Sequence, residues 1–358
     1  MKSIVSKICR SAKPIDRASL KKILFVKLFA IGDCLNTTPA LRALRKGLPE
    51  AQIDVMVGSW SSSVFRNNPH LDKLIVVEDS WFRQSDTRAL FKLLSKLRRE
   101  KYDAILLFHR APKLGFFFRL CNAPVLVGLD LENDGYCLTH PVLEKGVAHE
   151  IELYNSLIDS LNIPADGTRM EIFATKDEED RAKELWEGMG FEASDAVIGI
   201  IPGGSVSPGE VKPQRVWPYY GMLSVKLLKA GYKVVYFGGS GDLDALDDLP
   251  SVSDTYSFIG ECSLAVSADL MRRCRIVVCH DSGPMHLAAA AGTRVLSIFA
   301  PTDPRREAPL GEGNRFLAAR IECAPCYHRG HWPIECRREC LEIITPDQVM
   351  KVILEMMK

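Results

Sequence analysis

The stretch RIVVCHDSGPMHLAAAAGTRVLSIF, residues 275–299, has the pattern of a strand, a helix and a second strand. Its two ends, 275–279 and 295–299, are short runs rich in β-branched and apolar residues, which is typical of buried strands. The small residues at 287–291 suit a helix that packs closely on a sheet. We therefore expect parallel strands joined by a crossover helix.

The same alternation of strand-like runs and helical segments continues along the chain. Further strand-like runs lie at 23–28, 53–57, 74–77, 104–108, 196–201 and 233–237. A polar stretch within about 162–192 separates two series of such runs. The pattern predicts an α/β fold of two Rossmann-like doubly wound domains facing a central cleft. They span 23–165 and 190–345, after a basic leader (1–22) and before a helix (346–358) that packs back on the domains.

The composition of the 358 residues is that of a soluble globular protein, with 47% hydrophobic and 25% charged residues. The 46 basic and 45 acidic side chains leave a net charge of +1, which excludes an overall field for non-specific nucleic-acid binding. The sequence has neither a run of about 20 apolar residues nor the apolar core of a secretion signal. We expect a cytoplasmic protein whose eleven cysteines are mostly reduced.

The leader, residues 1–22, carries seven Lys or Arg against one Asp, with Ile4, Val5 and Ile8 spaced for one helical face. Two interpretations stay open. The leader is either a solvated flexible terminus or a peripheral anchor at a membrane surface.

The run at 23–28 is followed by a turn in which Gly32 allows a tight bend and Asp33 lies at or beside a helix N-cap. A capping carboxylate is one interpretation. The other is a general base, because the residue comes at the carboxyl end of a strand, where open parallel sheets bind ligands.

Two later loops also follow strands. In PGGSVSPGEVKPQRVWP (202–218), Gly203 and Gly204 allow close approach of backbone N–H groups to an anion, and Lys212 and Arg215 can neutralise a diphosphate; a structural turn is the alternative. In HDSGPMH (280–286), Asp281 or Ser282 can cap a helix whose N-terminus suits a phosphate. These loops predict a nucleotide site.

At these residues the sequence closely resembles glycosyltransferase family 9, the bacterial ADP-heptose:lipopolysaccharide heptosyltransferases. The segment KILFVKLFAIGDCLNTTPALRALRKGLPEAQIDVMVG (22–58) is similar to the family's N-terminal signature. HDSGPMHLAAAAGTRVLSIFAPTDP (280–304) is similar to its nucleotide-sugar signature. The segments 202–218 and VVYFGGSGDLDAL (234–246) follow in matching order, so the resemblance spans about 22–357.

The resemblance implies a GT-B fold, a donor nucleotide on the C-terminal domain, an acceptor on the N-terminal domain and inversion at the anomeric carbon. Asp33 matches the catalytic Asp that deprotonates the acceptor hydroxyl. Asp242 or Asp244 would meet the ribose, and Arg215 stands where the family commonly has Lys, a role that Lys212 could also fill. The expected donor site comprises Gly203, Gly204, Ser205, Lys212, Arg215, Asp242, Asp281, Ser282, Gly283, Pro284, Met285 and His286.

Backbone donors and a cation would stabilise the leaving ADP, so no metal is expected to be obligatory and Mg²⁺ is at most an activator. A glycolipid acceptor that bears phosphates calls for a basic wall. Gly32, Arg110, Lys113 and Arg119 are the expected acceptor residues, with His109 nearby. A solvated basic face is the alternative interpretation of these cations.

Four cysteines near the C-terminus, Cys323, Cys326, Cys336 and Cys340, have spacing close to that of a four-thiolate zinc knuckle. A structural zinc site and a set of reduced thiols in a surface loop are both open interpretations.

The leading hypothesis is an inverting heptosyltransferase. Two alternatives remain: another GT-B-like nucleotide-sugar enzyme, such as an epimerase or hydrolase, and a non-catalytic nucleotide- or glycan-binding protein. A dehydrogenase is disfavoured because no G-x-G-x-x-G follows a strand.

Overall fold

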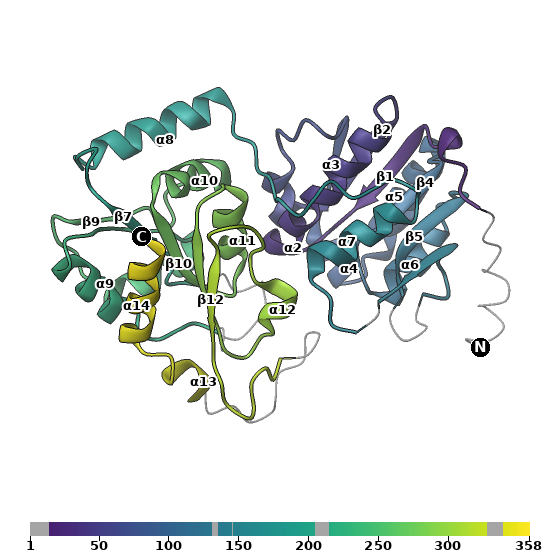
Figure 1. The fold of residues 1–358 in the computed structure, drawn as a ribbon. Helices are drawn as coiled ribbons and strands as arrows, with labels where there is room; N and C mark the ends of the chain where they lie inside the picture. The colour runs from purple at the N-terminus through teal and green to yellow at the C-terminus, as the bar shows by residue number, and fades with distance from the viewer. Residues whose placement is uncertain (1–13, 131–134, 145, 205–214, 328–338) are drawn as a thin grey trace. The chain divides into compact units, whose positions relative to one another are not determined.

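The computed structural model describes residues 14–130, 135–144, 146–204, 215–327 and 339–358 (Figure 1). The chain divides into two compact units, residues 1–169 and 170–358. Each unit is built on a parallel six-stranded sheet. The predicted fold class, two Rossmann-like doubly wound α/β domains, is confirmed.

Unit 1 has the strand order β3-β2-β1-β4-β5-β6. Its strands are β1 (Lys22–Val26), β2 (Gln52–Gly58), β3 (Lys73–Val77), β4 (Ala104–Leu107), β5 (Val125–Asp130) and β6 (His140–Leu143). Its helices are η1 (Arg17–Ser19), α2 (Ile31–Asn36), α3 (Thr38–Gly47), η2 (Ser59–Val64), α4 (Asp79–Arg83), α5 (Thr87–Glu100), α6 (Pro112–Arg119) and α7 (Glu150–Asp159).

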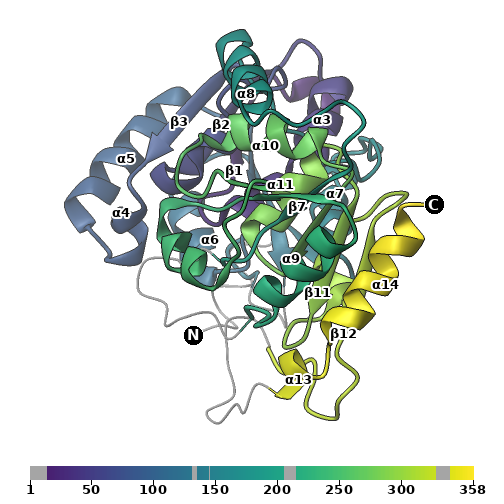
Figure 2. The same ribbon diagram turned by 90° about the vertical axis from the view of Figure 1, so that its left-hand side faces the viewer.

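The helices of unit 1 cover both faces of its sheet, as the doubly wound order requires. Helix α7 packs against α2 and α3. Leu93 and Leu97 of α5 and Phe118 of α6 pack against the sheet residues Leu24 and Val26 in a second core layer. Figure 2 shows α4 and α5 beside the edge strand β3.

Unit 2 has the strand order β12-β11-β10-β7-β8-β9. Its strands are β7 (Val197–Ile200), β8 (Lys233–Tyr236), β9 (Thr255–Ser257), β10 (Ile276–His280), β11 (Val295–Phe299) and β12 (Arg315–Ala318). Its helices are α8 (Lys176–Gly188), α9 (Tyr220–Lys229), η3 (Ser240–Asp248), α10 (Leu264–Arg273), α11 (Gly283–Ala290), α12 (Pro304–Glu307), α13 (Glu339–Glu342) and α14 (Pro346–Met356). The strand, helix and strand expected over 275–299 are β10, α11 and β11.

The last helix, α14, belongs to the core of unit 2. Val349, Ile353 and Met356 pack in one apolar cluster with Trp217, whose indole N–H donates to the carbonyl oxygen of Ile344 at 2.7 Å. Of the helices in the described ranges, none combines the length and the apolar character needed to cross a membrane.

Candidate functional site

A buried lysine organises the carboxyl end of β1. The Lys27 side chain is 5% exposed, and its ammonium group donates to the Tyr154 hydroxyl at 2.8 Å and to the Phe108 carbonyl oxygen at 3.1 Å. The same nitrogen lies 3.7 Å from Oδ2 of Asp33, whose side chain is 39% exposed. Burying an ammonium is costly unless it is paired and hydrogen-bonded, so these three partners are what allow Lys27 to stay inside.

The turn after β1 places Asp33 inside α2. The N-cap residue of α2 is Ala30, with φ +66°, and Asp33 lies in the first helical turn after buried Gly32. A non-glycine residue with positive φ is uncommon, and such strain concentrates at functional sites. Asp33 is therefore held at the sheet edge by a constrained turn, in a position other than the N-cap.

His109 follows β4 at the same edge and is half-buried. Its Nε2 accepts a hydrogen bond from the backbone N–H of Leu28 at 2.7 Å. Burial, together with the positive charges of Lys27 and Arg110, holds the pKa of His109 well below its usual value. His109 is thus a neutral acceptor that joins the ends of β1 and β4.

The three cations predicted to bind the acceptor do not lie together in unit 1. Arg110 donates to Glu144 at 3.1 Å and to Glu150 at 2.7 Å, so its charge is balanced by two carboxylates. Lys113 is exposed in the first turn of α6, close in sequence to Arg110. Arg119 ends α6, which runs back toward the start of β5, so the fold does not bring Arg119 to the edge that carries Arg110 and Lys113.

In unit 2, the carboxyl end of β10 carries an ion pair. Asp281, which is buried, lies 3.4 Å from the guanidinium of Arg215, and that guanidinium also stands 6.0 Å from the centre of the Tyr327 ring. Ser282 directs its hydroxyl to the carbonyl oxygen of His280, at 3.3 Å, and makes no capping bond to α11. The first turn of α11 then consists of Gly283, Pro284, Met285 and His286.

Two histidines lie at this turn, His280 before it and His286 within it. His280 is buried, and its Nδ1 shares a hydrogen bond of 2.9 Å with the Tyr220 hydroxyl. Burial, and then the charge of Arg215, lowers the pKa of His280 from 6.5 to about 4, so it is neutral at pH 7. The Nε2 atom of His286 lies 3.8 Å from a carboxylate oxygen of Glu307 on α12.

Asp242 joins two glycine loops. Its carboxylate accepts a hydrogen bond from the N–H of Gly239 at 2.9 Å, and burial raises its pKa. A Cβ added at Gly203 would lie 2.4 Å from Cγ of Asp242, so only glycine fits there. Asp242 therefore shapes the loops after β7 and β8, whereas Asp244 is exposed.

The structure does not test the predicted zinc site at the four C-terminal cysteines. Cys323 is exposed, and Cys340 is buried in a small cluster with Ala300 and Leu341. Among the described residues no three His, Cys, Asp or Glu side chains are grouped to hold a metal. Cys336 lies outside the described residues, so the zinc site stays a prediction.

Ser205 and Lys212 also lie outside the described residues. Sequence reasoning did not single out Lys27, Tyr154 or Tyr220. The signal for Lys27 was present, because a cation inside an otherwise apolar strand needs a buried partner. Nothing in the local sequence points to the two tyrosines.

The sequence model of glycosyltransferase family 9 (heptosyltransferase) matches residues 90–333, more than half of the chain. The chain belongs to glycosyltransferase family 9. It is accordingly a glycosyltransferase, as predicted. Lipopolysaccharide heptosyltransferase 2 of Escherichia coli K12 is 25% identical over 357 residues, covering 92% of this chain and 97% of that protein.

Two solved structures share the fold. A family 9 glycosyltransferase from Veillonella parvula superposes with a TM-score of 0.79 at 22% identity, covering 97% of this chain and 99% of its own. The Escherichia coli heptosyltransferase WaaC with ADP gives a TM-score of 0.70 at 18% identity, covering 94% and 99%.

The pKa of His280 predicts a stability change with pH. Between about pH 6.5 and 4 the unfolded chain binds a proton at His280 that the folded chain does not, so stability falls as the pH falls. We expect His280→Asn to reduce the loss of unfolding free energy between pH 7 and pH 5 by about 2 kcal/mol. Urea unfolding of both proteins at the two pH values measures this, and parallel losses would contradict it.

The contact between Gly203 and Asp242 predicts an asymmetry between two glycines. Gly203→Ala forces the Asp242 carboxylate to move, and we expect it to lower the free energy of unfolding by about 1–3 kcal/mol. Gly241→Ala is the matched control, because its Cβ would meet nothing within 4 Å, and we expect a change below about 0.5 kcal/mol. Equal effects of the two substitutions in urea unfolding would contradict this packing.

Proposed function

We propose that this enzyme transfers a heptose from ADP-heptose to a hydroxyl of a lipopolysaccharide core or a related surface glycan, with inversion. The observation that carries the proposal is Asp33, half in solvent at the carboxyl end of β1 and backed by the buried Lys27 ammonium. The name of the Escherichia coli relative and the ADP in the WaaC structure support the choice of donor and acceptor class.

Asp33 is the general base in this proposal. Its carboxylate accepts the proton of the acceptor hydroxyl while the hydroxyl oxygen forms a bond to the anomeric carbon. The bond between that carbon and the diphosphate oxygen breaks, and ADP leaves with the electron pair. Lys27 holds the carboxylate in place, because its buried ammonium group lies 3.7 Å from Oδ2 of Asp33.

The donor diphosphate is proposed to lie on unit 2. The N-terminus of α11 offers the positive end of a helix, and Arg215 supplies a guanidinium beside Asp281. These groups stabilise the leaving ADP, so Mg²⁺ is at most an activator in this scheme.

The other predicted site residues divide in the same way, with nucleotide residues on unit 2 and acceptor residues on unit 1. Gly203, Gly204 and Asp242 shape the loops that face the nucleotide, and Arg110 and Lys113 serve the acceptor. The enzyme meets its glycolipid acceptor as a peripheral protein at a membrane surface. A structural zinc on the four C-terminal cysteines remains a separate proposal, tested by metal analysis of the purified protein.

Asp33→Asn tests the base. We expect a loss of about 10²–10⁴-fold in kcat because the amide cannot accept the proton, with the affinity for ADP-heptose unchanged. Transfer to a lipopolysaccharide core acceptor measures kcat, and calorimetric titration measures donor affinity. Asp180→Asn, at an exposed helix position, is the control. Full activity of Asp33→Asn, or ADP release at full rate without acceptor in the unmodified enzyme, would contradict the proposal.

Lys27→Met tests the positioning of the base. The variant leaves Tyr154 and Phe108 in place but removes the charge beside Asp33. We expect kcat to fall about tenfold with the affinity for ADP-heptose unchanged, because the Asp33 carboxylate loses the ammonium group that orients it. Lys21→Met, at an exposed position, is the control. An unchanged kcat with a lowered free energy of unfolding would show that Lys27 is structural only.

A further inference from the structure

Helix α5 presents a cationic outer face. Its buried side chains, Leu93, Leu94 and Leu97, pack against the sheet. The opposite face, at helical spacing, carries Arg88, Phe91, Lys92, Lys96, Arg98 and Arg99, all exposed. Within α5, whose residues are all described, Glu100 is the acidic side chain, and it pairs with Lys22 and Lys73 on neighbouring strands at 2.5 and 3.2 Å.

Apolar groups lie among these cations. Phe91 is 71% exposed and borders a hollow together with Leu94 and Arg98. Phe116 on α6 is also about half exposed. Arg98 ties this face to α6, since its Nε donates to the carbonyl oxygen of Leu120 at 2.7 Å.

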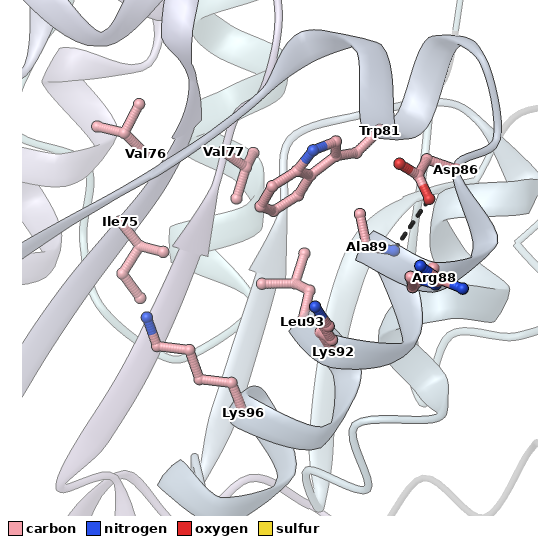
Figure 3. Close-up of a pocket in the computed structure, with 10 residues that line it drawn as sticks. All are labelled: Ile75, Val76, Val77, Trp81, Asp86, Arg88, Ala89, Lys92, Leu93 and Lys96. Carbon is pink, nitrogen blue, oxygen red and sulfur yellow. Dashed lines mark hydrogen bonds between the residues drawn. The ribbon is translucent and has the colours of Figure 1, made fainter.

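A hollow of about 340 Å³ lies between α5, α4 and β3 (Figure 3). Its apolar lining includes Ile75, Trp81 and Leu93. Three cations, Arg88, Lys92 and Lys96, and one carboxylate, Asp86, border it, and Asp86 accepts a hydrogen bond from the N–H of Ala89. An apolar floor under a cationic rim matches a lipid, which carries a phosphate above hydrocarbon.

We propose that this surface, formed by Phe91 and the α5 cations with Phe116, docks on an anionic lipid bilayer. The cations lie at the phosphates, and Phe91 enters the boundary between headgroups and acyl chains. Exposed apolar side chains among the cations favour a bilayer over a nucleic acid, whose backbone is bound through charge. The inference rests on the proposed peripheral association with a membrane and names the face that makes it, and it does not require the transfer reaction.

Vesicle binding tests the proposal without donor or acceptor. The full chain is sedimented with vesicles of phosphatidylglycerol and phosphatidylethanolamine, and with phosphatidylcholine vesicles alone. We expect binding to the anionic vesicles, weakened by salt. The triple variant Lys92→Gln, Lys96→Gln and Arg99→Gln is expected to lower the partition coefficient on the order of a hundredfold. Phe91→Ala is expected to lower it several-fold, including at high salt.

The matched control neutralises three exposed lysines of unit 2, Lys176→Gln, Lys183→Gln and Lys229→Gln, with the same change in net charge. It is expected to bind like the unmodified protein. Equal binding of the two triple variants would overturn the proposal. So would Phe91→Ala binding unchanged while an RNA oligomer competes fully, because the face would then be a general polyanion site. Circular dichroism of each variant excludes unfolding as the cause.

Discussion

The ammonium group of Lys27 constrains how unit 1 closes around the end of its first strand. A buried cation without partners would cost several kcal/mol, and this one is satisfied by groups from three elements. The Phe108 carbonyl follows β4, the Tyr154 hydroxyl belongs to α7, and the Asp33 carboxylate belongs to α2. Those elements must therefore meet at one point. The same point leaves a carboxylate facing water while its charge is balanced from inside.

Unit 2 also holds buried charged groups at the carboxyl ends of its strands, with different partners. Its strands also end at one edge, where the glycine loops after β7 and β8 close around the Asp242 carboxylate. At β10 the charges of Asp281 and Arg215 lie together beside a helix N-terminus. Neutral His280, held by Tyr220, allows this pair to sit on a buried strand end without a further charge.

Much of this architecture can be predicted from the sequence, because the patterns that encode it lie within short segments of the chain. Alternating apolar runs and small-residue helices predict the two parallel sheets, and Asp33 and the 280–286 segment come directly after strands. Partners far apart in the chain are not readable. Lys27 and Tyr154 are 127 residues apart, and Arg110 and its two glutamates are 34 and 40 apart. The position of Arg119 could not be predicted from the sequence either, because it depends on the length and direction of α6.

The positive φ of Ala30 restricts which residue types can occupy position 30, the N-cap of α2. At this φ of +66° and ψ of 124°, side chains with a Cβ are strained, β-branched ones most of all, whereas glycine adopts the conformation readily. Mutational tolerance at position 30 is therefore expected to be confined to a few residue types, although the side chain itself does no chemistry. Sequence change around Asp33 is therefore expected at neighbouring positions, with this single backbone angle retained.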